Sequence, residues 1–180
     1  GLHLITVANV RTEKGYLRML ETAKALKARK VEFTWLCVGA QPDAALLERM
    51  KREIAQSGLN EQMILLGPRA NPYPYMRRSR FLVNSSFTEG LPVIAMEALS
   101  LGKPIVATVP SVQETFGEEC CGLIAENSVA GLEAGMEKML TDEAFYAQVK
   151  AGAQKRSAFF DGKRMVKEVE EMFLSLVREP

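Results

Sequence analysis

Short apolar runs alternate regularly with longer stretches of helical patterning, and this alternation limits the fold more than any other feature of the sequence. Continuous apolar runs such as FTWLCVG and KPIVAT are typical of parallel strands that are covered on both faces. Repeated strand–helix units predict an α/β fold with a doubly wound, Rossmann-like parallel sheet and right-handed crossovers. The expected strands span residues 2–8, 33–38, 63–66, 81–84, 104–108 and 122–125, and the expected helices span residues 14–28, 43–57, 74–78, 92–101 and 111–116.

The chain changes character at Ser128, after which it is helical and charged to its end. The segment GKRMVKEVEEMFLSLV predicts an amphipathic last helix. We therefore expect one domain over residues 1–180 that carries a helical C-terminal tail.

Composition and charge argue against several classes of protein. A chain of 180 residues with 47% hydrophobic residues can bury a sizeable core without disulfides or a structural metal. Its net charge of +1 gives no support for bulk binding of nucleic acid, which requires a strong basic excess on one face. No apolar run approaches the roughly 20 residues that span a bilayer, and no signal segment opens the chain, so we expect a cytoplasmic protein without a membrane span.

The cysteines and the histidine form no pattern for metal binding or catalysis. Three cysteines make no disulfide framework, and a zinc site lacks its usual ligands because His3 is the only histidine. We expect Cys37, Cys120 and Cys121 to be small buried residues, and His3 to be packed in its strand or to lie at an edge. No metal ion and no cofactor is expected.

The stretch FTEGLPVIAMEALSLGKP predicts a turn followed by a helix, directly after a strand. Pro92 suits the first helical position, where its missing N–H costs nothing, and Gly102 and Pro104 end the helix. Ligands of doubly wound sheets bind at the carboxyl ends of the strands, beside helix N-termini whose free N–H groups attract phosphate. Gly90 allows a ligand to approach the backbone closely. We therefore expect an anion site at this turn.

Glu97 is a carboxylate inside this helix, which is otherwise apolar enough to be buried. Its helical neighbours three and four positions away are not cationic: Val93, Ile94, Ser100 and Leu101. A buried carboxylate without partners is costly, so Glu97 requires hydrogen-bond donors from elsewhere. Two interpretations are open at this point: the vicinal hydroxyls of a ribose supply the donors, or a neighbouring loop or helix end does.

The sequence EGLPVIAMEALSLGKPIVAT resembles the signature of the family 4 retaining glycosyltransferases, in which two glutamates are separated by seven residues. The resemblance is to the C-terminal, donor-binding half of a two-domain GT-B enzyme. It implies that Glu97 binds the ribose hydroxyls of a nucleoside-diphosphate sugar, and that Glu89 contacts hydroxyls of the transferred sugar. It also implies that the backbone N–H groups of Gly90 and Leu91 lie beside the sugar and the diphosphate.

The turn ANVRTEKGY resembles the family pattern Gly-Arg-Leu, three residues, Lys-Gly, whose Arg and Lys neutralise the donor diphosphate. Lys14 and Gly15 match this pattern. Asn9 stands where the family has arginine, and Arg11 is the candidate to replace that charge. Because a cation near a helix N-terminus opposes the helix dipole, an anion-binding role for Lys14 is favoured over that of a solvated lysine.

The loop after the third expected strand, LGPRANPYPYMRRSR, mixes aromatic residues with arginines. Such a mixture can bind nucleic acid by stacking and charge, but a solvated surface is the favoured interpretation. The resemblance implies that this loop lies beside the nucleobase. Pro68 and Arg69 are therefore candidates for base contacts, mostly through their backbone.

Ser111 and Glu114 have the Ser-x-x-Glu spacing of a capping box at a helix start. The resemblance also implies a glutamate near the donor pocket at this place. The structural interpretation is favoured.

Together these features predict the donor half, residues 1–180, of a retaining glycosyltransferase, with Lys14 and Glu89 as catalytic residues. The donor would be a UDP or GDP sugar, and the transferred hexose-type sugar would go to a glycan or lipid-linked acceptor bound by an N-terminal domain. The parent enzyme would be peripheral to the inner face of the membrane, and the isolated domain would bind donor weakly and transfer nothing. The alternatives are a sugar-nucleotide epimerase and a non-catalytic nucleotide-sugar-sensing or interaction module.

Overall fold

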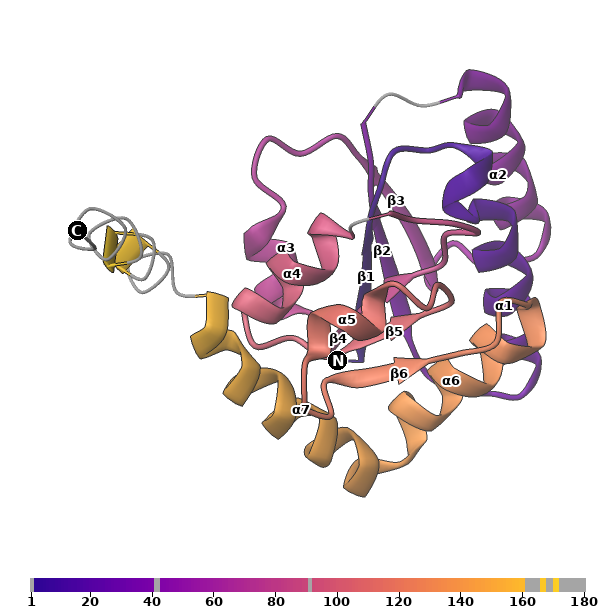
Figure 1. Ribbon diagram of the computed structural model, residues 1–180. Coiled ribbons are helices and arrows are strands. Elements are labelled where there is room, and N and C mark those ends of the chain that lie inside the picture. The colour runs from indigo at the N-terminus through magenta and orange to yellow at the C-terminus, as the bar shows by residue number, and fades with distance from the viewer. Residues whose placement is uncertain (1, 41–42, 91, 161–165, 168–169, 172–180) are drawn as a thin grey trace.

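The computed structural model describes residues 2–40, 43–90, 92–160, 166–167 and 170–171. Within these residues the chain forms a six-stranded parallel sheet in the order β3-β2-β1-β4-β5-β6 (Figure 1). The predicted α/β, doubly wound, Rossmann-like fold is confirmed. The strands are β1 (His3–Val7), β2 (Thr34–Val38), β3 (Met63–Gly67), β4 (Phe81–Asn84), β5 (Ile105–Ala107) and β6 (Gly122–Ile124).

Helices cover both faces of the sheet. The α-helices α1, α2 and α6 lie on one face, and α3, α4 and α5 lie on the other (Figure 1). The bounds are η1 (Thr12–Lys14), α1 (Tyr16–Ala28), α2 (Ala44–Gln56), α3 (Tyr73–Arg78), α4 (Val93–Ser100), α5 (Val112–Phe116), α6 (Val129–Thr141), α7 (Glu143–Ser157) and η2 (Ala158–Phe160).

The apolar strands pack into two separate cores, one for each face of the sheet. Leu4 belongs to the core under α1, α2 and α6, whereas the next residue, Ile5, belongs to the core under α3, α4 and α5. Trp35 and Val38 of β2 divide between the two cores in the same way. Because successive side chains of a strand point to opposite faces, a strand covered on both sides has to be apolar throughout.

Several helix starts are fixed by short polar side chains. The side chains of Asp43, Ser128 and Asp142 each accept a hydrogen bond from the backbone N–H three residues further on, and these residues precede α2, α6 and α7. Such caps satisfy N–H groups that the first helical turn leaves without partners.

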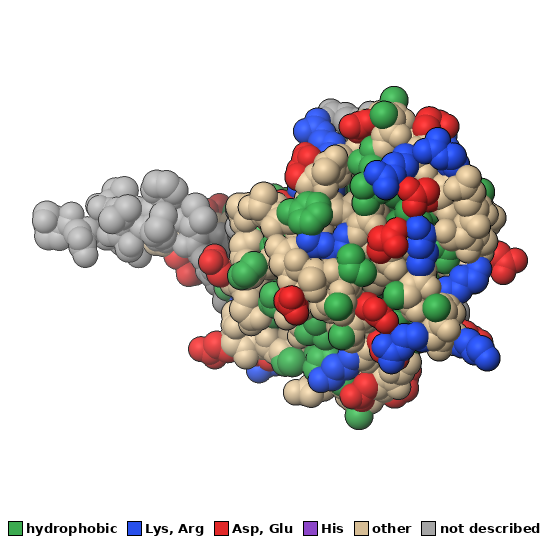
Figure 2. Space-filling model, turned by 90° about the vertical axis from the view of Figure 1, so that its right-hand side faces the viewer, with side chains coloured by type: hydrophobic (Ala, Val, Ile, Leu, Met, Phe, Trp, Pro, Cys, Tyr) green, Lys and Arg blue, Asp and Glu red, His purple; other side chains and the backbone are tan. Residues whose placement is uncertain are grey.

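The outer surface of α1, α2 and α6 carries both signs of charge, closely mixed (Figure 2). Lys24 of α1, for example, pairs with Glu21 at 2.8 Å and with Glu53 of α2 at 3.0 Å. Exposed pairs of this kind contribute little to stability. The mixture leaves no field of a single sign on this face, which agrees with the near-zero net charge.

The predicted elements match the observed ones to within a few residues. Lys14 was expected inside the first helix but lies in the short 3-10 turn η1, and Pro92 is the residue before α4 and not its first residue. The predicted last amphipathic helix lies mostly outside the described residues. None of the helices in the described part of the chain combines the length and the apolar character that crossing a bilayer requires.

The strand order places a crevice between β1 and β4. β1 pairs with β2 on one side and with β4 on the other, so the connections leave the sheet in opposite directions at this point. In doubly wound sheets, ligands bind at such a switch point, outside the carboxyl ends of the strands. The site is therefore to be sought where β1 and β4 end.

Candidate functional site

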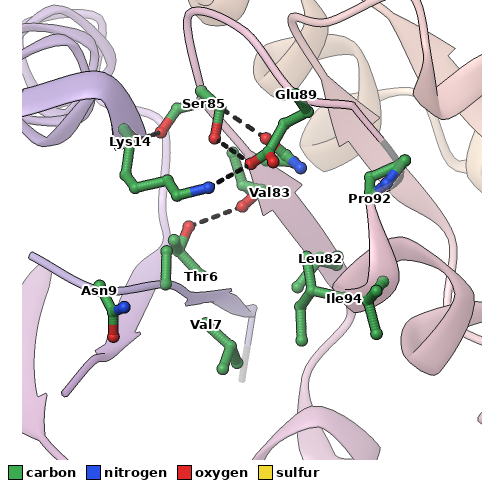
Figure 3. A pocket seen from close by; sticks show the side chains of 14 residues that line it. Thr6, Val7, Asn9, Lys14, Leu82, Val83, Ser85, Glu89, Pro92 and Ile94 are labelled. Atoms are coloured by element: carbon green, nitrogen blue, oxygen red, sulfur yellow. Dashed lines mark hydrogen bonds and ion pairs between the residues drawn. The ribbon is translucent and has the colours of Figure 1, made fainter. Parts of the chain in front are cut away.

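A cavity of about 280 Å³ lies at the carboxyl ends of β1 and β4 (Figure 3). Its floor is held by a chain of buried hydrogen bonds: Trp35 Nε1 donates to Thr6 Oγ1 at 3.0 Å, and Thr6 Oγ1 donates to the carbonyl of Val83 at 2.8 Å. The lining residues are Thr6, Val7, Ala8, Asn9, Lys14, Leu82, Val83, Asn84, Ser85, Ser86, Glu89, Pro92, Val93 and Ile94.

Lys14 and Glu89 point toward one another across this cavity (Figure 3). Lys14 Nζ donates to Glu89 Oε1 at 2.7 Å, and Ser86 Oγ donates to the same oxygen at 2.7 Å. The two charged side chains are 25% and 16% exposed, so they remain open to a ligand but are partly withdrawn from water. The cavity therefore presents a cation, a carboxylate and neutral hydroxyl and amide groups within one small volume.

The loop between β4 and α4 is tied to the turn between β1 and α1. Ser85 Oγ donates to the carbonyl of Lys14 at 2.9 Å, and the N–H of Phe87 donates to the carbonyl of Glu13 at 2.9 Å. The two segments thus form connected walls of the cavity. Residues that are 71 positions apart in the sequence are held in fixed register by these bonds.

Gly15 makes this connection possible through its missing side chain. Its φ of 73° is in the left-handed region, and a Cβ built there would lie 2.0 Å from the carbonyl oxygen of Ser85. Only glycine adopts this conformation without cost and leaves room for the second wall. Gly15 is not among the residues that line the cavity.

The N-terminus of α4 faces the cavity through Pro92, Val93 and Ile94. No side chain caps this helix, so its first N–H groups are available to an anion. Gly90 lies in the preceding turn and is exposed. Leu91, a predicted backbone contact, lies outside the described residues.

Asn9 and Arg11 occupy different places. Asn9 lines the cavity at the end of β1, as Figure 3 shows. Arg11 is not a lining residue; its Nη1 lies 3.9 Å from Glu13 Oε1, and both of these side chains are about half exposed. The structure therefore places the guanidinium of Arg11 outside the lining of the cavity.

Glu97 is not buried, which corrects the expectation from the sequence. It is of intermediate exposure on α4, and its Oε1 accepts a hydrogen bond from the hydroxyl of Tyr73 at 3.1 Å. This bond raises the pKa of Tyr73. The helix faces its core with Ala95, Ala98 and Leu99, so position 97 falls on the outer side. Glu97 is not among the residues that line the cavity.

Pro68 and Arg69, the candidates for base contacts, lie apart from the main cavity. Pro68 lines a separate apolar cavity of about 50 Å³ with residues such as Val10, Tyr16 and Gly39. Arg69 is exposed, and its Nε donates to the hydroxyl of Tyr75 at 3.2 Å.

Tyr16, which lines the same small cavity as Pro68, is buried, and this burial raises the pKa of its hydroxyl. That hydroxyl donates to the carbonyl of Ala8 at 2.8 Å.

Two structural expectations from the sequence are wrong. Ser111 and Glu114 form no capping box: the Ser111 side chain makes no cap, and its Oγ donates instead to the carbonyl of Glu89 at 3.2 Å, which ties α5 to the cavity wall. Cys120 is exposed, whereas Cys37 and Cys121 are buried as expected. His3 is exposed at the amino end of β1, at the edge opposite the cavity.

The sequence interpretation missed the polar residues that build the cavity wall. Asn84, Ser85 and Ser86 line the cavity and are buried, and the polar run NSS directly after an apolar strand was a detectable sign of them. Arg18 also contacts this wall, from the side away from the cavity, and no pattern in the sequence indicated that it would.

In the described part of the chain no group of three or more His, Cys, Asp or Glu side chains is arranged to hold a metal ion.

Comparison with solved structures shows the same fold. HepE from Anabaena, solved in complex with UDP and glucose, matches with a TM-score of 0.81 and 17% identity over 97% of this chain and 48% of that chain. The C-terminal domain of the glycosyl transferase group 1 family protein LpcC from Francisella tularensis matches with a TM-score of 0.77 and 20% identity over 88% of this chain and 86% of that chain.

Curated relatives match over part of their length. The N-acetylgalactosamine-N,N'-diacetylbacillosaminyl-diphospho-undecaprenol 4-alpha-N-acetylgalactosaminyltransferase of Campylobacter jejuni is 29% identical over 122 residues, which are 66% of this chain and 33% of the relative. The 2-deoxystreptamine glucosyltransferase of Streptomyces kanamyceticus is 28% identical over 153 residues, which are 82% of this chain and 39% of the relative. The chain thus spans less than half of the length of these two relatives.

The family model described as glycosyl transferases group 1 matches residues 2–156, from the start of β1 to the last turn of α7. This match covers the whole sheet and both walls of the cavity. The chain therefore belongs to the glycosyl transferases group 1 family.

Proposed function

We propose that this chain is the donor-binding half of a retaining glycosyltransferase of family 4 type and that its cavity binds the diphosphate of a nucleoside-diphosphate sugar. The observation that carries the proposal is the convergence of Lys14 and the uncapped N-terminus of α4 on one cavity at the switch point of the sheet. A cation and free helix N–H groups together are suited to phosphate oxygens. The solved relative with UDP and glucose supports the class of ligand.

Each predicted residue takes a role that its position permits. Lys14 neutralises the diphosphate, and Glu89 and Ser86 accept and donate hydrogen bonds to hydroxyls of the sugar. Glu97 lies outside the lining, so a ribose would have to extend from the cavity along the outer side of α4 to reach it, where it would compete with Tyr73 for the carboxylate.

Catalysis in this site would be mainly electrostatic. When the bond between the anomeric carbon and the diphosphate breaks, negative charge grows on the leaving diphosphate, and Lys14 and the α4 N–H groups stabilise it. The incoming acceptor hydroxyl would bond to the anomeric carbon on the face that the diphosphate leaves, and its proton would pass to an oxygen of the leaving diphosphate. The acceptor would be a glycan or a lipid-linked sugar bound by an N-terminal half, since the relatives are much longer than this chain.

Isothermal titration of the chain with UDP, GDP, ADP and their sugars tests this proposal. We expect one nucleotide to bind, and we expect Lys14→Ala and Glu97→Ala to weaken that binding at least tenfold. Lys24→Ala and Glu53→Ala, which break a partly buried ion pair between α1 and α2 outside the cavity lining, are the matched controls and should bind as the wild type does. Absence of any nucleotide binding at millimolar concentration, with the proteins folded, would refute the proposal.

A non-catalytic nucleotide-sugar-sensing module is the second candidate, and one observation favours it. Asn9 faces the cavity where the resembling enzymes have arginine, so one positive charge is missing from the lining. Transfer assays on the complete parent protein separate the two candidates. Turnover of the bound sugar nucleotide supports the enzyme, and binding without turnover in the presence of acceptor candidates supports the module.

A further inference from the structure

Arg18 is a buried cation without a carboxylate partner among the residues that the structure describes. The residue lies on α1 and is 5% exposed. No carboxylate of the described residues lies within ion-pair distance of its guanidinium. Burial lowers its pKa, but an arginine remains protonated at any physiological pH. A buried charge that nothing neutralises is costly and requires an explanation.

All contacts of the Arg18 guanidinium are neutral, and they lead to one wall of the cavity. Its Nη1 donates to Thr108 Oγ1 at 2.9 Å and lies 3.4 Å from the carbonyl oxygen of Ser85. Thr108 Oγ1 in turn donates to the carbonyl of Ser86 at 2.8 Å. The guanidinium also stacks over the ring of Phe87 at 4.2 Å. Arg18 therefore lies directly behind the wall that Ser85 and Ser86 present to the cavity.

The charge balance of the cavity shows what Arg18 adds. Lys14 and Glu89 are the charged residues of the lining, and they form a pair whose charges cancel. An anion that enters the cavity thus meets no net charge from the lining. The guanidinium behind the wall carries a positive charge that no carboxylate of the described residues offsets, and because it is buried, water screens its field toward the cavity only weakly.

A purely structural role accounts for only part of this arrangement. Hydrogen bonds to Thr108 and to the loop carbonyl require a donor but no full charge. The contact with the Phe87 ring uses the charge only in part, so an anion in the cavity would still compensate most of it.

We propose that Arg18 is a positioning residue which holds the β4–α4 loop and supplies, from behind the cavity wall, the uncompensated positive charge that attracts the phosphate groups of the donor. Arg18 does not touch the ligand; it acts through Ser85, Ser86 and the electrostatic potential of the cavity. The inference rests on the proposed function only in naming the anion as a diphosphate.

The test measures affinity for inorganic pyrophosphate and for UDP by titration calorimetry at low ionic strength. Arg18→Met removes the charge and keeps the bulk, whereas Arg18→Lys keeps the charge. Arg80→Met is the matched control, because Arg80 is a partly buried arginine just before β4, at the opposite edge of the sheet. We expect Arg18→Met to weaken both ligands about tenfold, Arg18→Lys to stay within about threefold of the wild type, and Arg80→Met to have no effect.

The outcomes separate the two proposals. Arg18→Met that binds within twofold of the wild type overturns the inference, and so does Arg18→Lys that loses as much affinity as Arg18→Met. Arg18-dependent binding of pyrophosphate without binding of any nucleotide refutes the proposed function and supports the inference. A wild type that binds neither pyrophosphate nor a nucleotide refutes both.

A measurement on the wild type covers the case in which Arg18→Met does not fold. The guanidinium NMR signals of Arg18 should shift when pyrophosphate is added, while those of Arg80 should not. Unchanged Arg18 signals at saturation would overturn the inference.

Discussion

The two edges of the sheet each hold a partly or fully buried arginine, and the two guanidinium groups have different kinds of contact partner. At the amino edge, Arg80 donates to Glu143 at 2.7 Å and to the carbonyl of Met139, and it stacks on Tyr146 at 3.6 Å. At the carboxyl edge, Arg18 contacts only neutral groups. Both arginines stack on an aromatic ring, but among the described residues only Arg80 has a carboxylate that offsets its charge.

The largest expected effect concerns the junction of the two cavity walls. Gly15→Ala places a methyl group where the carbonyl oxygen of Ser85 lies and forces a left-handed conformation on alanine. Gly102→Ala, at the amino edge, has a φ of 64° but meets its nearest atom, in Gln154, only at 3.4 Å. We expect Gly102→Ala to cost about 1–2 kcal/mol of unfolding free energy and Gly15→Ala at least about 2 kcal/mol more.

Urea unfolding of the two variants beside the wild type measures this difference. Nucleotide binding should be lost in Gly15→Ala and retained in Gly102→Ala. Equal losses of unfolding free energy for the two substitutions would contradict this prediction. They would show that the two cavity walls can move apart to make room for the added methyl group.

The second effect concerns the two arginines themselves. Arg80→Met loses an ion pair, a backbone hydrogen bond and a ring contact, so we expect a loss of about 1 kcal/mol of stability. Arg18→Met loses hydrogen bonds and a ring contact but also removes a buried charge without a carboxylate partner, so we expect the two effects to offset to within about 1 kcal/mol. Urea unfolding without ligand is the measurement. If Arg18→Met lost more unfolding free energy than Arg80→Met, the proposed difference between the two arginines would be wrong.

A third, smaller effect is the coupling between Lys14 and Glu89. A double-mutant cycle with Lys14→Met and Glu89→Gln should give a coupling of up to about 1 kcal/mol, because both side chains are partly exposed. Saturating pyrophosphate should abolish this coupling, because the anion would replace Glu89 as the ion-pair partner of Lys14. The cycle for Arg80 and Glu143 at the other edge should not respond to pyrophosphate. Coupling in the Lys14 cycle that persists at saturation would place the anion elsewhere.

The smallest effect is expected at an exposed contact of the carboxyl edge. Tyr73→Phe removes the hydrogen bond to Glu97 and should not shift the urea midpoint measurably, because both groups can bond to water instead. It should, however, leave Glu97 free for a ribose and so should not weaken nucleotide binding. A clear loss of binding in this variant would assign the tyrosine itself to the ligand.

Much of the fold followed from local patterns, whereas the site depended on contacts between distant segments. The continuous apolar strands required two covering layers, so the parallel sheet could be predicted from runs such as FTWLCVG. The capping box at Ser111 did not form: its Oγ accepts no bond from the helix and instead donates to the carbonyl of Glu89, 22 positions away, which no local rule includes. Glu97 was misjudged because an apolar helix with one covered face was taken to be covered all round.

Arg18 shows the limit most clearly. In the sequence it is one cation of an ordinary helix, and its burial arises only when the β4–α4 loop and Thr108 close over it. The lysine and the glutamate of the cavity were found because they stand in a resembling motif, and Arg18 stands in none.

The pairing of β1 with β4 also determines when the site comes into existence. The hydrogen bond from Thr6 to Val83 joins residues 77 positions apart, and the bond from Lys14 to Glu89 joins residues 75 positions apart. A chain leaving the ribosome can assemble β1, β2 and β3 into half a sheet before β4 has been made, because these three strands are neighbours. That half contains one wall and no cavity. A ligand of this cavity would therefore stabilise the finished domain but could not guide the first half of its folding, and β4 would have to close onto β1 without help from the ligand.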